Sequence, residues 1–132
     1  MAENQKAKLY DLEDRTFEFA DDVRKFFPGL PRTLANGEDV KQLVRSSGSV
    51  AADHIEANES LSKKDFILRI KICRKEAKES RLWLRLLNTG TNAQNDQQQQ
   101  ALTQEAGELV RIFTAILAKC EGPFEFFEYW NL

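Results

Sequence analysis

A line of positively charged residues follows one flank of the segment from Lys63 to Arg85. Its members recur at steps of three and four residues, which keeps side chains on one flank of a helix: Lys71, Arg74, Lys78, Arg81 and Arg85. The segment holds nine Lys or Arg and three Asp or Glu, a charge of +6, whereas the ten cations and eighteen carboxylates elsewhere give −8. Such a line can neutralise phosphates, so the backbone of RNA or DNA is the candidate ligand. The competing interpretation is ion pairing, within or between subunits, with acidic residues near the N-terminus: Glu13, Asp14, Glu18, Asp21 and Asp22.

Other side chains capable of chemistry form no recognisable arrangement. The sequence has one His and two Cys, His54, Cys73 and Cys120, and lacks a phosphate-binding Gly-rich loop or a nucleophile motif. We expect His54 to be hydrogen-bonded and either buried or at an interface, and both cysteines to be small apolar core residues. The sequence therefore predicts no catalytic residue, no metal site and no cofactor, and a protein that is not an enzyme.

Four helices would have to position the cation line. Apolar residues at helical spacing predict an all-α fold, and no segment shows the alternation typical of a strand. The short connections favour an antiparallel, up-down-up-down four-helix bundle in a single domain, 1–132. The expected helices span residues 12–27, 37–58, 62–88 and 97–120.

Local signals set the expected helix ends. Asn36 and Ser62 are the candidate N-caps, and Gly122 with Pro123 should end the last helix. The polar, glutamine-rich residues 88–100 are typical of a flexible loop.

The third expected helix has two apolar faces. One is a heptad seam that predicts the core: Phe66, Ile70, Cys73, Ala77, Ser80, Leu84 and Leu87. The other predicts an interface between subunits, or packing against loops or the C-terminal tail: Leu68, Ile72, Leu82, Trp83 and Leu86.

Two further stretches carry packing signals. The small residues 46–49 inside the second helix favour close packing against aromatic side chains of the first and fourth helices: Phe17, Phe19, Phe26 and Phe113. The tail, 122–132, contains five aromatic residues, and we expect it to dock on the bundle, on a neighbouring subunit or on another protein. Neither a signal peptide nor a long apolar run is present, so we expect a cytoplasmic protein that does not enter a membrane.

Three stretches together resemble a known family: YDLEDRTFEFADDVRKF, QLVRSSGSVAADHIEANESLSKKDFILRIKICRKEAKESRLWLRLL and LTQEAGELVRIFTAILAKC. This is the four-helix-bundle family whose first members are encoded in intervening sequences of bacterial large-subunit ribosomal RNA genes. It is similar in fold to the accessory protein of diversity-generating retroelements. The resemblance implies a closed homo-oligomeric ring, a pentamer, with a basic surface that binds nucleic acid.

The resemblance covers residues 10–120 and carries over to particular positions. Two positions depart from the family pattern: Asp53 stands where these proteins often carry Asn, and His54 where an apolar or aromatic residue is expected. Both changes add polarity to the second helix. The positions that match are Arg45, Ser46, Ser47, Gly48, Glu56, Asn58, Lys63, Lys64, Lys71, Arg74, Lys75, Glu76, Lys78, Glu79 and Arg81.

Two functions follow as expectations. The first is non-enzymatic binding of RNA or DNA by an oligomer through the cation line. The alternative is a protein-interaction scaffold that uses the second apolar face or the aromatic tail.

Overall fold

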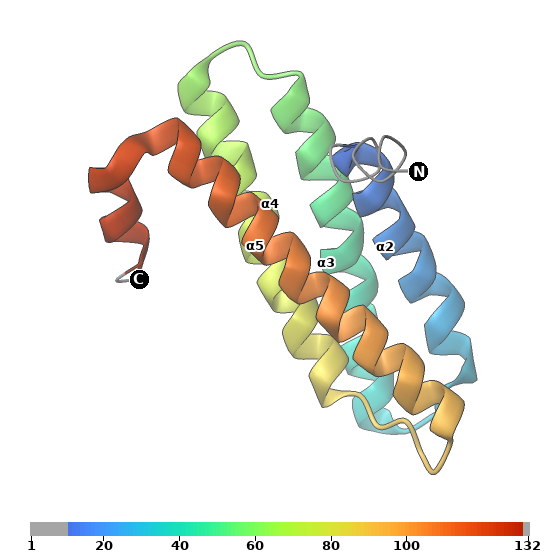
Figure 1. Ribbon diagram of the computed structural model, residues 1–132. Coiled ribbons are helices and arrows are strands. Elements are labelled where there is room, and N and C mark those ends of the chain that lie inside the picture. The colour runs from blue at the N-terminus through green and yellow to red at the C-terminus, as the bar shows by residue number, and fades with distance from the viewer. Residues whose placement is uncertain (1–10, 131–132) are drawn as a thin grey trace, which may run out of the picture.

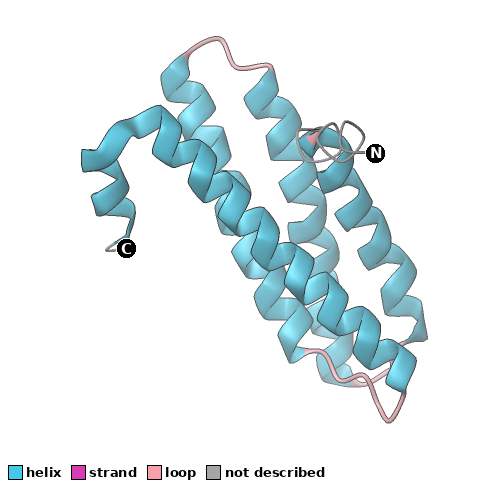
Figure 2. Ribbon diagram, viewed as in Figure 1, coloured by secondary structure: helices cyan, strands magenta, loops and turns pink. Residues whose placement is uncertain are grey.

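Four antiparallel helices pack side by side in the computed structural model (Figure 1), which describes residues 11–130 and their side chains up to Cys120. The helices are α2 (Leu12–Phe26), α3 (Leu34–Asn58), α4 (Lys63–Leu86) and α5 (Ala93–Trp130), with a short 3-10 turn, η1 (Phe27–Gly29). Helix α2 packs against α3 and α5, and α4 packs against the same two helices, so α2 and α4 lie diagonally opposite. No β-strand occurs in residues 11–130 (Figure 2). The predicted all-α, up-down-up-down bundle is confirmed.

The start of α4 follows its predicted cap, whereas the start of α3 does not. The Ser62 hydroxyl accepts a hydrogen bond from the Asp65 amide at 3.1 Å. For α3 the cap is Thr33, whose hydroxyl accepts from the Asn36 amide at 3.1 Å, so the predicted cap at Asn36 is wrong. Asn36 is instead buried. Its side-chain amide donates to the carbonyl oxygens of Pro31 and Asn88 at 2.9 and 2.8 Å, and its oxygen accepts from the Asn88 amide at 2.9 Å.

The glutamine-rich segment is helical, so the predicted loop over residues 88–100 is wrong for most of its length. The Asn92 side chain accepts from the Asn95 amide at 2.9 Å, and α5 begins at Ala93. The Gln99 side chain then donates to the last carbonyl oxygens of α4, at Leu84 and Leu87, over 2.8 and 2.9 Å. A glutamine thus satisfies acceptors that the end of α4 would otherwise leave unpaired.

The predicted end of the last helix at Gly122 and Pro123 is also wrong. The backbone of α5 remains helical to Trp130, and it changes direction near its C-terminal end (Figure 1). The aromatic side chains of the tail, 122–132, lie outside the described residues, and so does their predicted docking.

The heptad seam of α4 forms the centre of the core, as predicted. Its side chains from Ile70 to Leu87 are buried, and Phe66 packs against them. They join Phe19 from α2 and Phe113 from α5 in one hydrophobic cluster. Because the seam points inward, the C-terminal part of the cation line and the leucines of the second apolar face are exposed to solvent.

Residues 46–49 serve packing, as predicted, and two of them make polar contacts with neighbouring helices. The buried hydroxyls of Ser46 and Ser80 hydrogen-bond at 2.8 Å and join α3 to α4. At Gly48 an added Cβ would lie 3.2 Å from the Arg24 guanidinium, which crosses from α2 and donates to the Val44 carbonyl oxygen at 3.4 Å. Phe17 is 63% exposed, so its expected role as a packing partner is wrong.

Candidate nucleic-acid interface

The cation line of α4 divides into two parts. Lys71 and Arg74, in its N-terminal half, are partly buried and have interactions of their own. The C-terminal three, Lys78, Arg81 and Arg85, are exposed to solvent. This second part is the more accessible to an anionic ligand.

The exposed part of the line has no carboxylate partner among the described residues, whereas other cations of α4 are paired. Arg69 forms ion pairs with Glu56 at 2.7 Å and Asp65 at 3.7 Å, and Lys75 lies 3.6 Å from Glu76. No ion pair within residues 11–120 involves Lys78, Arg81 or Arg85. For these three, the suggested ion pairs with the acidic residues of α2 within one chain are therefore wrong, and the diagonal position of α2 explains why.

A groove lies between α4 and α5 beside the exposed cations. Its volume is about 480 Å³, and none of its lining residues carries a carboxylate. Arg81 and Arg85 line it from α4, and α5 contributes Gln99, Gln100, Thr103, Gln104, Gly107 and Arg111. A third arginine thus joins two members of the cation line.

The contribution of α5 to this groove was missed in the sequence. Gln100, Gln104, Gly107 and Arg111 are spaced four, three and four residues apart, which is the spacing of one helix face. The expected helix over residues 97–120 contains all four positions, but the prediction rested on its apolar residues and overlooked this polar face.

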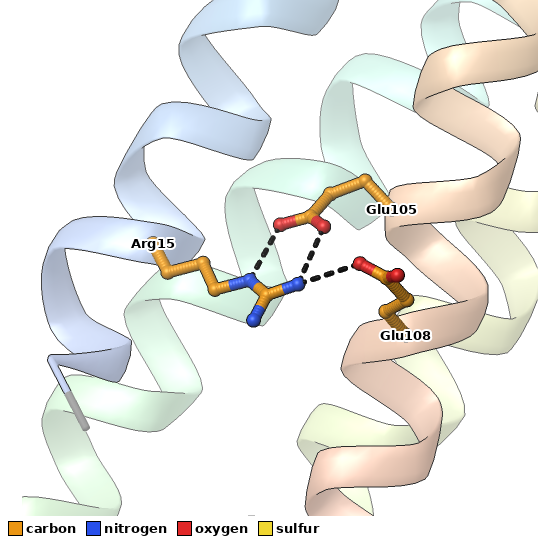
Figure 3. A network of polar contacts seen from close by, with 3 residues as sticks. All are labelled: Arg15, Glu105 and Glu108. Carbon is orange, nitrogen blue, oxygen red and sulfur yellow. Dashed lines mark hydrogen bonds and ion pairs between the residues drawn. The ribbon is translucent and has the colours of Figure 1, made fainter. Parts of the chain in front are cut away.

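Two acidic residues of α5, Glu105 and Glu108, face α2 and bind its Arg15 (Figure 3). The Arg15 guanidinium donates to both carboxylate oxygens of Glu105, at 2.8 and 2.7 Å, and to Glu108 at 2.8 Å. The hydrogen bond to Glu105 is the main cause of the raised pKa of Arg15. Helix α5 therefore presents carboxylates to α2 and an arginine with amides to the groove.

The second apolar face of α4 is only partly exposed. Leu68, Leu82 and Leu86 are 53%, 46% and 55% exposed, so these leucines keep about half their surface in water. Ile72 is partly buried, and Trp83 packs against the core. The leucines are the residues most available to a neighbouring molecule.

His54 and Cys73 are both buried. His54 is buried as predicted, but its Nδ1 has no hydrogen-bond partner, so the hydrogen-bonded part of the prediction is wrong. Burial lowers the pKa of the imidazole, opposed by the charges of Glu13 and Asp11. Burial raises the pKa of the Cys73 thiol to about 12, so this thiol stays protonated and unreactive at neutral pH.

Two further features are absent from the described part of the chain. Residues 11–120 contain no group of three or more His, Cys, Asp or Glu that could hold a metal ion. No helix in the described part is long and apolar enough to cross a membrane.

The fold and the exposed cations define a class, an all-helical four-helix-bundle protein with a cation-rich helix. Residues 10–115 match the model of the 23S rRNA-intervening sequence protein family, and the chain belongs to that family. The predicted family resemblance is confirmed.

A solved structure is similar to this chain in sequence and fold. It is a protein of unknown function from the S23 ribosomal protein family of Bacteroides thetaiotaomicron, with 28% sequence identity and a TM-score of 0.65. The match covers 80% of this chain and 96% of that one. No curated protein matches the chain.

Proposed function

We propose that the protein binds the phosphate backbone of RNA or DNA through the cation line of α4, as a homo-oligomer and without catalysing a reaction. The observation that carries the proposal is the charge distribution. In a chain of net charge −2, the exposed side of α4 presents Lys78, Arg81 and Arg85 without carboxylate partners among the described residues.

The dimensions of the line support several phosphate contacts. From Lys71 to Arg85 the helix rises about 20 Å at 1.5 Å per residue. Duplex nucleic acid carries one charge per about 1.7 Å of axis, so a line of this length meets several phosphates. Such contacts bind independently of sequence and weaken as salt rises.

A charge-reversal pair tests the proposal. The test variant carries Lys78→Glu, Arg81→Glu and Arg85→Glu, and the control carries Arg32→Glu, Lys41→Glu and Arg45→Glu, which reverses three exposed cations outside the line. Both variants change the net charge equally. Binding is measured by fluorescence anisotropy with a labelled structured RNA, and with DNA of the same sequence, at two salt concentrations.

The expected result is that only the test variant loses binding and that wild-type affinity falls as salt rises. Equal loss in both variants would show that overall charge, not the line, determines binding. Retained binding in the folded test variant would refute the assignment.

The exposed leucines of α4 support the homo-oligomer. Leu68, Leu82 and Leu86 together would leave an apolar face in water in an isolated chain. We propose that this face lies between subunits in a closed ring of five, the number that the family resemblance implies. Light scattering should give five times the mass of one chain, and Leu82→Lys with Leu86→Lys should give a folded monomer.

The same apolar face favours the second candidate, a protein-interaction scaffold. Here the partner would be another protein, held by the leucines or by the aromatic tail. Deleting residues 124–132 discriminates between the two. Loss of the oligomer or of a bound protein, with no nucleic-acid affinity in the intact chain, would favour the scaffold.

A further inference from the structure

The groove between α4 and α5 has the size of a ligand site. Its volume of about 480 Å³ falls within the range of about 300–1,000 Å³ that is common for small-molecule pockets. It lies between the C-terminal half of α4 and the N-terminal half of α5, two helices that pack side by side (Figure 1). Two rigid helices thus fix the positions of the groups that line it.

Gly107 shapes the groove. A Cβ at this position would lie 3.8 Å from Nε of Arg81, so the Arg81 side chain lies directly over the glycine. A glycine in the middle of a helix is unfavourable by itself. Here the missing side chain keeps the groove open and lets an arginine of α4 reach across to α5.

The groove is strongly cationic. Arg81, Arg85 and Arg111 line it, and no ion pair within the described residues uses any of the three. Glu108, which lies three residues before Arg111 on the same helix and could have paired with it, is bound by Arg15 on the α2 side. A planar guanidinium group can bind two phosphate oxygens at once. Three arginines in one groove therefore favour a phosphate group as the ligand.

Amide side chains complete the lining. Gln100 and Gln104 are exposed on the face of α5 that carries Arg111. Each amide offers donors and an acceptor, the groups that recognise base edges or a ribose hydroxyl. A recess of this size has room for one nucleotide, whereas a duplex keeps its bases paired and stacked inside.

We propose that this groove binds one unpaired nucleotide of an RNA or DNA strand, with its phosphate on Arg81, Arg85 and Arg111 and its base or sugar against Gln100 and Gln104. The inference rests on the proposed function and deepens it. The main contacts to nucleic acid would then lie in the groove rather than along the side of α4, and α5 would form part of the interface.

Four single variants test the groove. Arg111→Gln removes the cation contributed by α5, and Gly107→Leu fills the groove without a change in charge. Gly107→Ala is the steric control, because its Cβ makes only ordinary contacts with Arg81. Arg45→Gln is the charge control, because Arg45 is exposed on α3 and does not line the groove.

Binding is measured with a labelled single-stranded oligouridylate and with an RNA duplex of equal length, and the fold of each variant is checked by circular dichroism. We expect Arg111→Gln and Gly107→Leu each to weaken single-strand binding by about tenfold. Both controls should stay within about twofold of wild type. Duplex binding should be weaker than single-strand binding and indifferent to Gly107→Leu.

The other outcomes separate the two proposals. If Arg111→Gln and Gly107→Leu both bind as tightly as wild type, but charge reversal along α4 abolishes binding, the groove is not the binding site. The proposed function would then still hold. If Gly107→Leu weakens the affinity for duplex and for single strand equally, the occupant of the groove is not an unpaired nucleotide. Uridine monophosphate binding as tightly as the oligonucleotide would make the occupant a free nucleotide and overturn the proposal. A wild-type protein that binds no nucleic acid at low salt ends the proposed function and this inference with it.

Discussion

Two glycines in helix interiors offer a matched test of how arginines cross between helices in this bundle. Gly48 lies in the middle of α3 and Gly107 in α5. An added Cβ at Gly48 would meet the Arg24 guanidinium at 3.2 Å, and one at Gly107 would meet Arg81 at 3.8 Å. The two sites thus differ mainly in how closely an arginine approaches.

The expected free energies follow from these distances. Replacing a helix-interior glycine with alanine raises stability by about 1 kcal/mol through backbone entropy. At Gly107 the contact distance is ordinary, so Gly107→Ala should show this full gain. At Gly48 the guanidinium must shift by a few tenths of an ångström, which weakens its hydrogen bond to the Val44 carbonyl oxygen. Gly48→Ala should therefore gain less than about 0.5 kcal/mol.

Urea unfolding at one fixed protein concentration measures both variants, since an oligomer's stability depends on concentration. A third and a fourth protein complete the test: Arg24→Ala alone, and Arg24→Ala with Gly48→Ala. In the Arg24→Ala background the guanidinium is absent, so Gly48→Ala should raise the free energy of unfolding by the full amount of about 1 kcal/mol. Equal stabilisation at Gly48 and Gly107 in the wild-type background would refute the reasoning, because Arg24 would then impose no constraint.

Three further predictions concern polar groups between helices. Arg15→Gln should lower the free energy of unfolding, measured in urea, by about 1–2 kcal/mol. In a double-mutant cycle, Glu105→Gln should lower it less in the Arg15→Gln background than in wild type, because the two residues act through one ion pair. Asn36→Ala should lower the free energy of unfolding by about 2–3 kcal/mol, because it leaves the Asn88 amide and two carbonyl oxygens without their partly buried hydrogen bonds; an unchanged urea midpoint would contradict this. Burial lowers the pKa of His54 in the folded chain below its ordinary value of 6.5, so the unfolded chain takes up the proton first and stability falls as pH drops below about 6.5. His54→Leu should remove that fall, which thermal unfolding from pH 8 to pH 5 would detect as a smaller pH dependence than in wild type.

The fold was predictable because its main signals are periodic. The heptad seam of α4 determined the inward face of that helix, and Ser62 marked its start with the expected hydrogen bond. The loop predicted over residues 88–100 was wrong because a polar composition was interpreted as a sign of flexibility. Gln99 instead binds the carbonyl end of α4, a tertiary contact that no local pattern reveals.

The candidate interface was predictable on α4 alone. Helical spacing placed Arg81 and Arg85 together, but their meeting with Arg111 depends on the packing of α4 against α5. The buried position of His54 was expected, yet its unpaired Nδ1 was not, because hydrogen-bond partners depend on neighbouring helices. The sequence thus predicted which side chains share a helix face, but not which side chains of other helices they contact.

The asparagines near the helix connections make the two ends of the bundle unequal. The α2–α3 and α4–α5 connections lie at one end, whereas α2 begins and the α3–α4 link lies at the other (Figure 1). At the first end, Asn36 bonds to Asn88, and Asn95 donates to the carbonyl oxygen of Gly29 at 3.1 Å. Thermal opening of the helices should therefore begin at the end without these cross-links, and amide hydrogen exchange should slow progressively along each helix toward the asparagines. The proposed nucleotide groove, near the start of α5, would then belong to the slowest-exchanging part of the molecule, where a binding site keeps its shape while the opposite end opens and closes.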